Sequence, residues 1–329
     1  MGEFDLIERY FKRPARRAAL GVGDDCALLR VGSGQQLAVS SDMLVQGRHF
    51  FADVDPVTLG HKALAVNLSD LAACGAAPLA FTLALALPRV DEPWLAAFSR
   101  GLFALADAHG CELVGGDTTR GPLTICITVF GEVPAPGGVS QALLRSGARV
   151  GDDIYVSGTL GDARLALLAL RGELRLPDGL LAQTRLRLEC PTPRVALGRA
   201  LRGIASAAID VSDGLLGDLG HVLHASQLGA AVDADTVRQL LACDPQTIDP
   251  PLPAQTLMAC VLAGGDDYEL AFTAPASARG AVAAAAHASA TPVTRIGQIQ
   301  AQPGLRLVDG NGNQVANGFP SFDHFAQDT

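Results

Sequence analysis

Five short segments of this 329-residue chain combine glycine or serine with aspartate, residue types that together can bind metal ions and phosphate. Glycine lets a backbone approach a ligand closely, and the neighbouring carboxylate supplies a hard oxygen ligand. A single Asp-Gly pair is usually only a turn. A repeated pattern with a sixth carboxylate, Asp70, indicates a site. The segments are Gly21-Val22-Gly23-Asp24-Asp25, Val39-Ser40-Ser41-Asp42, Gly115-Gly116-Asp117-Thr118-Thr119, Ile209-Asp210-Val211-Ser212-Asp213-Gly214 and Gly264-Gly265-Asp266-Asp267-Tyr268-Glu269.

These aspartates predict a hard divalent cation, which could be magnesium, manganese or calcium, with phosphate as its co-ligand. Carboxylates gathered in one site repel one another unless a cation neutralises them, and magnesium characteristically joins a few carboxylates to substrate phosphates. The P-loop is excluded because it needs glycine before its lysine, whereas Phe11 and His61 precede the two lysines of the chain. The H-R-D and D-F-G triplets of protein kinases are absent as well. We therefore expect several magnesium ions, helped by Arg120 and Arg145, to neutralise the phosphates.

Two further motifs have simpler explanations. Asp53-Val54-Asp55-Pro56-Val57 matches the pattern of phosphatases that form an aspartyl-phosphate, but Asp55-Pro56 is better explained as the start of a helix. Asp309-Gly310-Asn311-Gly312-Asn313 imitates the start of a calcium loop. It lacks the required later glycine and glutamate, which favours a tight turn. On pattern alone, His49 and Phe319 are structural residues.

The elements that must position these segments alternate between helix and strand. Apolar spacing predicts helices over residues 58–74, carrying Asp70, and over 93–109, closed by Gly110. Strands are expected over 111–114, 123–133, 154–156, 207–211, 230–234 and 269–273, with an alanine-rich helix near 276–290 and short strands near Ile296 and Leu307. Leu113-Val114-Gly115-Gly116-Asp117 resembles Leu262-Ala263-Gly264-Gly265-Asp266, and we expect each to be a strand end followed by two glycines and an aspartate.

Length and composition indicate the number of domains, the kinds of partner and the cellular location. The length predicts two α/β domains, and the proline- and glycine-rich stretch from Pro134 to Gly138 with the turn that follows puts their boundary near residue 148, giving 1–147 and 148–329. A net charge of -9 without a basic stretch argues against nucleic acid as a partner. Seven scattered cysteines, acidic residues near the N-terminus and no apolar run of membrane-spanning length predict a cytoplasmic protein with reduced thiols.

Taken in order, these segments resemble the thiamine-monophosphate kinase family, within the superfamily of aminoimidazole ribonucleotide synthetase and selenophosphate synthetase. Glycine-aspartate pairs are shared across that superfamily. The Asn67-Leu68-Ser69-Asp70-Leu71-Ala72 helix, the His49-Phe50 pair and the ending Phe322-Asp323-His324-Phe325 are far more specific to the kinase. The match extends from one end of the chain to the other.

The resemblance implies two α/β domains, a homodimer whose N-terminal sheets form a barrel, and conversion of ATP and thiamine monophosphate to ADP and thiamine diphosphate by in-line attack. It implies magnesium ligands at Asp24, Ser40, Ser41, Asp42, Asp70, Asp117, Asp210 and Asp213, of which Asp42, Asp117 and Asp210 are the expected catalytic residues. It implies nucleotide contacts at Gly116, Asp117, Arg145 and Ser212, and thiamine phosphate contacts at His49, Asp266 and Phe319.

This chain departs from the family where thiamine phosphate would bind, with Asp266 in place of the usual glutamate and Phe319 in place of the usual tryptophan. A shorter carboxylate and a smaller ring predict weaker contact with a cationic, aromatic substrate. Two other functions remain open. One is an ATP-dependent synthetase of the same superfamily, and the other is a nucleotide- and metal-binding module without turnover.

Overall fold

The structure is a computed structural model that describes residues 2–23, 25–244, 248, 251–315 and 319. The predicted magnesium ligand Asp24 and the motif at 322–325 lie outside these residues. The chain forms two compact units, residues 1–71 with 76–142, and residues 72–75 with 143–329. It passes from the first unit to the second after Ala142. The assignment of separate functions to domains 1–147 and 148–329 stays a prediction.

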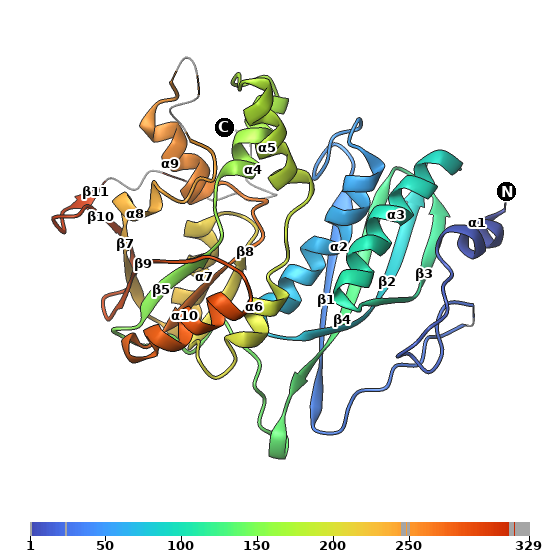
Figure 1. Ribbon diagram of the computed structural model, residues 1–329, viewed down its shortest axis with the longest axis horizontal. Helices are drawn as coiled ribbons and strands as arrows, with labels where there is room; N and C mark the ends of the chain where they lie inside the picture. Colours follow the sequence, from blue (N-terminus) through green and yellow to red (C-terminus); the bar gives the residue numbers. More distant parts are fainter. Residues whose placement is uncertain (1, 24, 245–247, 249–250, 316–318, 320–329) are drawn as a thin grey trace. The chain divides into compact units, whose positions relative to one another are not determined.

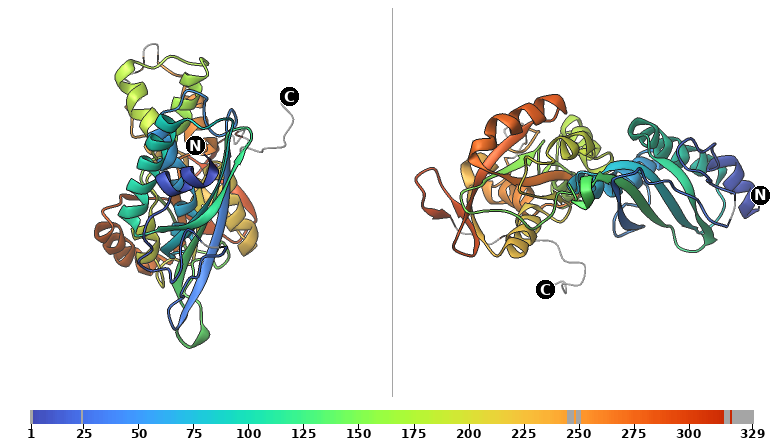
Figure 2. Two further views of the ribbon diagram at one scale, coloured as in Figure 1. Left: turned by 90° about the vertical axis from the view of Figure 1, so that its right-hand side faces the viewer. Right: turned by 90° about the horizontal axis from the view of Figure 1, so that it is seen from below.

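The first unit is a four-stranded sheet with two long helices on one face (Figures 1 and 2). The sheet has the order β1-β4-β2-β3, with β2 and β3 parallel and the other neighbours antiparallel. Its elements are α1 (Glu3–Tyr10), β1 (Gln35–Val45), α2 (Pro56–Ala73), β2 (Ala77–Leu87), α3 (Glu92–His109), β3 (Glu112–Arg120), β4 (Thr124–Pro134) and the short 3-10 turn η1 (Pro136–Gly138).

Both long helices were predicted, and their ends show why. Asp55 accepts a hydrogen bond from the Val57 N–H at the start of α2, as the helix-start interpretation requires. Asp91 caps α3 by accepting from the Trp94 N–H, and Gly110 closes that helix in the left-handed conformation. Ile125, Ile127 and Val129 of β4 are buried beneath the helices, because alternate side chains of a strand share one face.

The second unit is a seven-stranded mixed sheet with the order β11-β10-β7-β9-β5-β8-β6. Only the β7–β10 pair is parallel among its described strand pairs. Its strands are β5 (Asp153–Ser157), β6 (Ala207–Val211), β7 (Gly229–Asp233), β8 (Glu269–Ala274), β9 (Val293–Gln300), β10 (Gly304–Val308) and β11 (Gln314–Val315). Its helices are α4 (Asp162–Leu170), α5 (Asp178–Glu189), α6 (Val195–Ala200), α7 (Leu215–Ser226), α8 (Ala234–Val237), α9 (Ala254–Ala263), the 3-10 turn η3 (Ala276–Ala278) and α10 (Arg279–Ala288).

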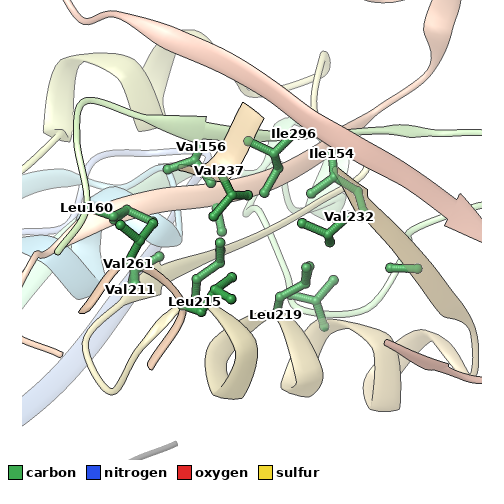
Figure 3. Close-up of a cluster of buried hydrophobic side chains, with 14 of the residues drawn as sticks. Ile154, Val156, Leu160, Val211, Leu215, Leu219, Val232, Val237, Val261 and Ile296 are labelled. Carbon is green, nitrogen blue, oxygen red and sulfur yellow. The ribbon is translucent and has the colours of Figure 1, made fainter. Parts of the chain in front are cut away.

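The main core of this unit lies between α7 and the sheet. Figure 3 shows Leu215 and Leu219 of α7 directed toward Ile154, Val211 and Val232 from three strands. These side chains are almost fully buried, so the β6–α7 connection, which carries the predicted site residues Ser212 and Asp213, starts from a rigidly packed strand. α6 and α10 lie on the opposite face of the sheet (Figures 1 and 2).

Three sequence expectations need correction. Leu262 and Ala263 are the last turn of α9, so the second Gly-Gly-Asp follows a helix and not a strand. The first Gly-Gly-Asp lies inside β3, which continues to Arg120 through extended backbone paired with β2. The segment from Val39 to Asp42, for which no strand was predicted, lies within the long strand β1. No helix among the described residues is both long and apolar enough to cross a membrane.

Candidate active site

In the first unit, β1 and α2 bring together three of the predicted magnesium ligands. The Ser40 hydroxyl donates to a carboxylate oxygen of Asp70 at 2.5 Å. The main-chain N–H of Asp42 donates to the side-chain oxygen of Asn67 at 3.1 Å, and the Asn67 amide in turn donates to the Ala63 carbonyl. Asn67 therefore fixes β1 against α2 beside the hydrogen bond between Ser40 and Asp70, a role that the sequence did not reveal.

The Ser41 hydroxyl lies on the opposite face of the same strand. Side chains alternate along a strand, so the neighbours Ser40 and Asp42 share one face and Ser41 has the other. The Ser41 hydroxyl is 3.0 Å from the Thr128 hydroxyl and donates to the Ile127 carbonyl at 3.2 Å. Its side chain is therefore not part of the group formed by Ser40, Asp42 and Asp70.

Gly116 and Asp117 line a pocket of about 680 Å³ in the first unit, along β3. Gly116 has φ +147°, and a Cβ atom there would lie 1.8 Å from the Leu83 carbonyl oxygen. Only glycine fits this backbone. Asp117 follows with an exposed side chain. The close approach of β3 to β2 thus directs an aspartate and bare peptide groups into a pocket of the size that holds small molecules.

In the second unit, the loop that follows β6 wraps around a buried carboxylate. Asp210 is the penultimate residue of β6 and is 6% exposed. The N–H groups of Ser212 and Asp213 both donate to one oxygen of Asp218, each at 3.0 Å. Burial raises the pKa of Asp218 to about 6. Sequence reasoning missed Asp218. An acidic residue in the first turn of α7 was the available signal.

The loop from Gly264 to Tyr268 is hydrogen-bonded to that same connection. The Asp266 N–H donates to the Ser212 carbonyl, and the Tyr268 N–H donates to the Val211 carbonyl, both at 2.8 Å. Asp266 and Tyr268 have φ values of 70° and 52°, which are uncommon for non-glycine residues, so the surrounding hydrogen bonds must hold the loop in this conformation. The predicted nucleotide residue Ser212 and the predicted acceptor residue Asp266 therefore belong to one hydrogen-bonded structure.

Behind this loop lies a buried ionic network. Glu269 is fully buried and accepts hydrogen bonds from Ser157, Arg187 and Arg194. Asp267 is also buried and accepts from the Gly161 N–H at 2.9 Å, and burial raises the pKa of its carboxyl well above the ordinary value. These contacts join the loop to the strands and helices around it, so Asp267 and Glu269 support the structure of the loop. Asp266 differs from both, because its carboxylate is only half-buried.

The remaining predicted residues have separate surroundings. The His49 side chain accepts from the Val45 N–H at 3.0 Å through Nδ1, within the turn that follows β1. Phe319 packs against the core of the second unit and lines a pocket of about 560 Å³ between α4 and α9, which Arg164 and Thr256 also line. The exposed Arg145 accepts, through its carbonyl, from the Ser226 hydroxyl.

No three histidine, cysteine, aspartate or glutamate side chains converge as a metal-binding group within the described residues. The donor types nevertheless suit magnesium. Ser40, Asp42 and Asp70 offer a hydroxyl and carboxylates, and these hard oxygens are the ligands that magnesium takes in proteins.

The two units also match known domain families. The model for the AIR synthase related protein, N-terminal domain, matches residues 23–133, and the model for the C-terminal domain matches residues 149–310. The fold and the aspartate-bearing site thus define a two-domain, mixed α/β protein of the AIR-synthase-related class, with one sheet in each unit.

Comparison with individual proteins identifies the family within this class. Thiamine-monophosphate kinase of Salmonella typhimurium is 49% identical over 99% of this chain and 98% of that protein. The crystal structure of thiamine-monophosphate kinase from Stenotrophomonas maltophilia is 45% identical, covers 95% of this chain and 96% of its own, and has a TM-score of 0.79. AaThiL complexed with AMPPCP and TMP is 27% identical over 89% of each chain, with a TM-score of 0.75. The chain belongs to the thiamine-monophosphate kinase family.

Proposed function

We propose that this protein transfers the γ-phosphoryl group of ATP to thiamine monophosphate, giving ADP and thiamine diphosphate. The observation that carries the proposal is the 49% identity over nearly the full length of a protein named for this activity. The similar fold of AaThiL, solved with AMPPCP and TMP, agrees with an ATP analogue and a monophosphate as the two ligands. The oxygen ligands and glycine-bearing segments described above are what such a reaction requires.

The proposed mechanism is direct, in-line attack by the phosphate of the acceptor, without a phosphorylated enzyme. A phosphate monoester is largely ionised near neutral pH, so no strong base is needed, and the main barrier is the approach of two anions. Magnesium, held by Ser40, Asp42, Asp70, Asp117, Asp210 and Asp213, and also by Asp24 and Ser41 in the family pattern, would supply the positive charge that offsets this repulsion.

The chain itself would position the two substrates. We assign the phosphates of ATP to the bare backbone at Gly116, to Asp117 through the metal, and to Ser212 and Arg145. His49, Asp266 and Phe319 would contact thiamine monophosphate. The support for a coordinated site is the pair of hydrogen bonds from Asp266 and Tyr268 to the Ser212 loop, which would tie the position of the acceptor to that of the nucleotide.

The proposal includes a homodimer. β1 is an edge strand of its sheet, and its outward side chains Leu37, Val39 and Met43 are 42%, 57% and 56% exposed. Exposed apolar edges invite pairing with another sheet, and a second copy would cover these residues in a shared barrel. Val39→Glu is therefore expected to lower the mass measured by analytical ultracentrifugation to that of one chain, while Val90→Glu, at an exposed loop position, leaves the mass unchanged.

We also propose that the reaction takes place in the cytoplasm. The seven cysteines are free thiols, which suits a reducing compartment.

A panel of acceptors tests the function. The protein is incubated with ATP, magnesium and one acceptor at a time, and ADP is measured. We expect ADP only with thiamine monophosphate and only with magnesium present. Turnover with formylglycinamidine ribonucleotide or selenide would instead identify a synthetase, and ATP binding without ADP formation with any acceptor would identify a binding module.

A second experiment tests the proposed metal residues. Asp210→Asn keeps the size of the side chain but removes the charge that a metal ligand needs, so we expect loss of turnover with an unchanged circular dichroism spectrum. Near-normal activity of this variant would contradict the role of Asp210.

A further inference from the structure

The pocket along β3 has a second wall that the proposed reaction leaves without a role. One wall consists of Leu113 to Thr118, and the other is the short helix α1, which contacts both β3 and α3. Phe4 and Ile7 of α1 line the pocket together with Phe11, which directly follows the helix. Their spacing of three and four residues puts them on one face of the helix.

The two walls differ in chemistry. The β3 side offers exposed backbone at Gly116, the Asp117 carboxylate and the Thr118 hydroxyl, whereas the α1 side offers three apolar side chains next to the ion pair of Glu8 and Lys12. A nucleotide has the same two halves, a charged phosphate chain and a flat base with apolar faces. The volume of about 680 Å³ lies within the range for such ligands.

Phe4 has no visible structural use. Its side chain is 81% exposed, although Phe11 on the same face is only 4% exposed and packs edge-on against Phe98 of α3. An exposed phenylalanine beside a pocket is better explained by a ligand or a partner than by packing, because exposure of its ring to water is unfavourable.

α1 is nevertheless held in place. Arg9 and the Tyr10 hydroxyl both contact Glu92 at the start of α3, at 2.7 and 3.3 Å. Arg13 forms a salt bridge with Asp107 and lies over the Phe103 ring at 3.6 Å. The basic residues near the N-terminus therefore fasten α1 to α3. The helix is fixed while its Phe4 ring stays exposed, as a preformed stacking surface requires.

We propose that α1 forms the base-binding wall of the nucleotide site and that Phe4 stacks on the adenine ring. The inference rests on the proposed function, because it places the phosphates of the same nucleotide at Gly116 and Asp117. It adds a specificity element, because a flat aromatic base is needed to fill this side of the pocket.

The chain contains a reporter for this site. Trp94, the only tryptophan, stacks on Phe98 with ring centroids 5.0 Å apart, and Phe98 contacts the pocket residue Phe11. Binding of a base against α1 is therefore expected to change the fluorescence of Trp94, while inorganic triphosphate, which has no base, leaves it nearly unchanged.

The test compares wild type, Phe4→Ala, Phe4→Trp and the control Val90→Ala, which shortens another exposed apolar side chain of the first unit. Dissociation constants for AMPPCP and for inorganic triphosphate, both with magnesium, are measured by calorimetry on the full chain. Loss of a base–aromatic stack predicts roughly tenfold weaker AMPPCP binding by Phe4→Ala. Phe4→Trp and Val90→Ala should bind AMPPCP within about twofold of wild type, and all four proteins should bind triphosphate equally.

Equal AMPPCP binding by wild type and Phe4→Ala would overturn the inference but leave the proposed function intact. Equal weakening of AMPPCP and triphosphate by Phe4→Ala would also overturn it, because the effect would then not concern the base. A change in oligomeric state in Phe4→Ala would assign Phe4 to a subunit contact instead. Failure of wild type to bind AMPPCP would overturn both the inference and the proposed function.

Discussion

The sequence Gly-Gly-Asp occurs once in each unit, and the two copies have different backbones. Residues 115–117 continue the extended strand β3, where Gly116 is the residue with positive φ, at +147°. Residues 264–266 follow α9, and there the aspartate itself has positive φ, at 70°, while neither glycine does. An identical tripeptide therefore has different conformational demands at the two sites.

The support for each aspartate differs as well. Asp117 is held by the pairing of β3 with β2, where it lies opposite Ala84. Asp266 is held by a hydrogen bond from its N–H to the Ser212 carbonyl, and Ser212 in turn donates to Asp218. A strand ladder positions the first aspartate, whereas a neighbouring loop positions the second. The first should tolerate distant changes, and the second should depend on every member of its hydrogen-bonded chain.

Alanine substitution of the four glycines gives the largest expected effect. In Gly116→Ala the new Cβ would meet the Leu83 carbonyl oxygen at 1.8 Å in a backbone that alanine avoids, so the free energy of unfolding should fall by at least about 4 kcal/mol. In Gly115→Ala the nearest atom lies 3.8 Å away, so the change should stay within about 1 kcal/mol.

In the second copy both glycines should be required. A Cβ at Gly264 would lie 2.1 Å from the Cys260 carbonyl oxygen, and one at Gly265 would lie 2.4 Å from the Ser212 carbonyl oxygen. Urea unfolding of the four variants measures the difference. Equal destabilisation by Gly115→Ala and Gly116→Ala would contradict this explanation, because the positive φ of Gly116 would then not be what makes glycine necessary there.

Replacing the two aspartates by asparagine should separate their chemical roles. Asp117→Asn removes a carboxylate assigned to the metal and the nucleotide, so kcat should fall roughly 100- to 1,000-fold. Asp266→Asn removes a contact assigned to the acceptor, so the KM for thiamine monophosphate should rise roughly tenfold with kcat and the KM for ATP nearly unchanged. Steady-state kinetics with each substrate varied in turn provide the measurement. A large fall in kcat for Asp266→Asn with an unchanged KM for thiamine monophosphate would contradict this separation, because Asp266 would then act in catalysis as Asp117 does.

The sequence predicted the elements whose signals are local. α2 and α3 have apolar residues at helical spacing and clear ends, at Asp55 and at Gly110. β1 and β2 were not predicted. In β1 the polar run from Ser40 to Asp42 interrupts the apolar alternation. The strand β2 is a nearly continuous apolar run and shows little alternation, because most side chains on both of its faces are buried or partly buried.

The sequence could suggest side chains that would bind a ligand directly, but it could not reveal side chains that bind the backbone of another segment. Asp42, Asp70, Asp117 and Asp210 are proposed as metal ligands from their residue type, their neighbours and the family resemblance, and this assignment stays a prediction. Asn67 and Asp218 act by accepting main-chain N–H groups from segments 25 and five or six residues away, and only the fold makes these pairs. The equivalence of the two Gly-Gly-Asp segments failed for the same reason, since the difference lies in what precedes each one.

Asp218 tests whether the second aspartate depends on its neighbouring loop. Asp218→Ala leaves the N–H groups of Ser212 and Asp213 without their common acceptor, which should lower the free energy of unfolding by about 2 kcal/mol. Through Ser212 and Asp266 it should also raise the KM for both substrates. Asp218→Asn keeps an acceptor oxygen and removes a charge that burial disfavours, so it should restore most of the stability and the KM values. Unchanged KM values in the folded Asp218→Ala variant would show that the loop does not transmit its position to Asp266.

Phe319 should give the smallest effect, and it concerns the acceptor side alone. Its ring packs on the core of the second unit and lines the pocket between α4 and α9. Tryptophan has the larger and more electron-rich face for a thiazolium cation, so Phe319→Trp should lower the KM for thiamine monophosphate about two- to fivefold, equivalent to about 0.5–1 kcal/mol. Phe319→Leu, which keeps an apolar side chain without a ring, should raise it.

The informative measurement for these Phe319 variants is the KM for ATP in the same experiments. If the Phe319 side chain contacts only the thiamine group, neither substitution changes the KM for ATP. An unchanged KM for thiamine monophosphate in both variants would show that no stacking occurs at Phe319. If a Phe319 variant changed the KM for ATP as well as the KM for thiamine monophosphate, the two binding sites would be coupled, because only the acceptor side was altered. The hydrogen bond between Asp266 and Ser212 would be the connection that transmits the change from the acceptor to the nucleotide.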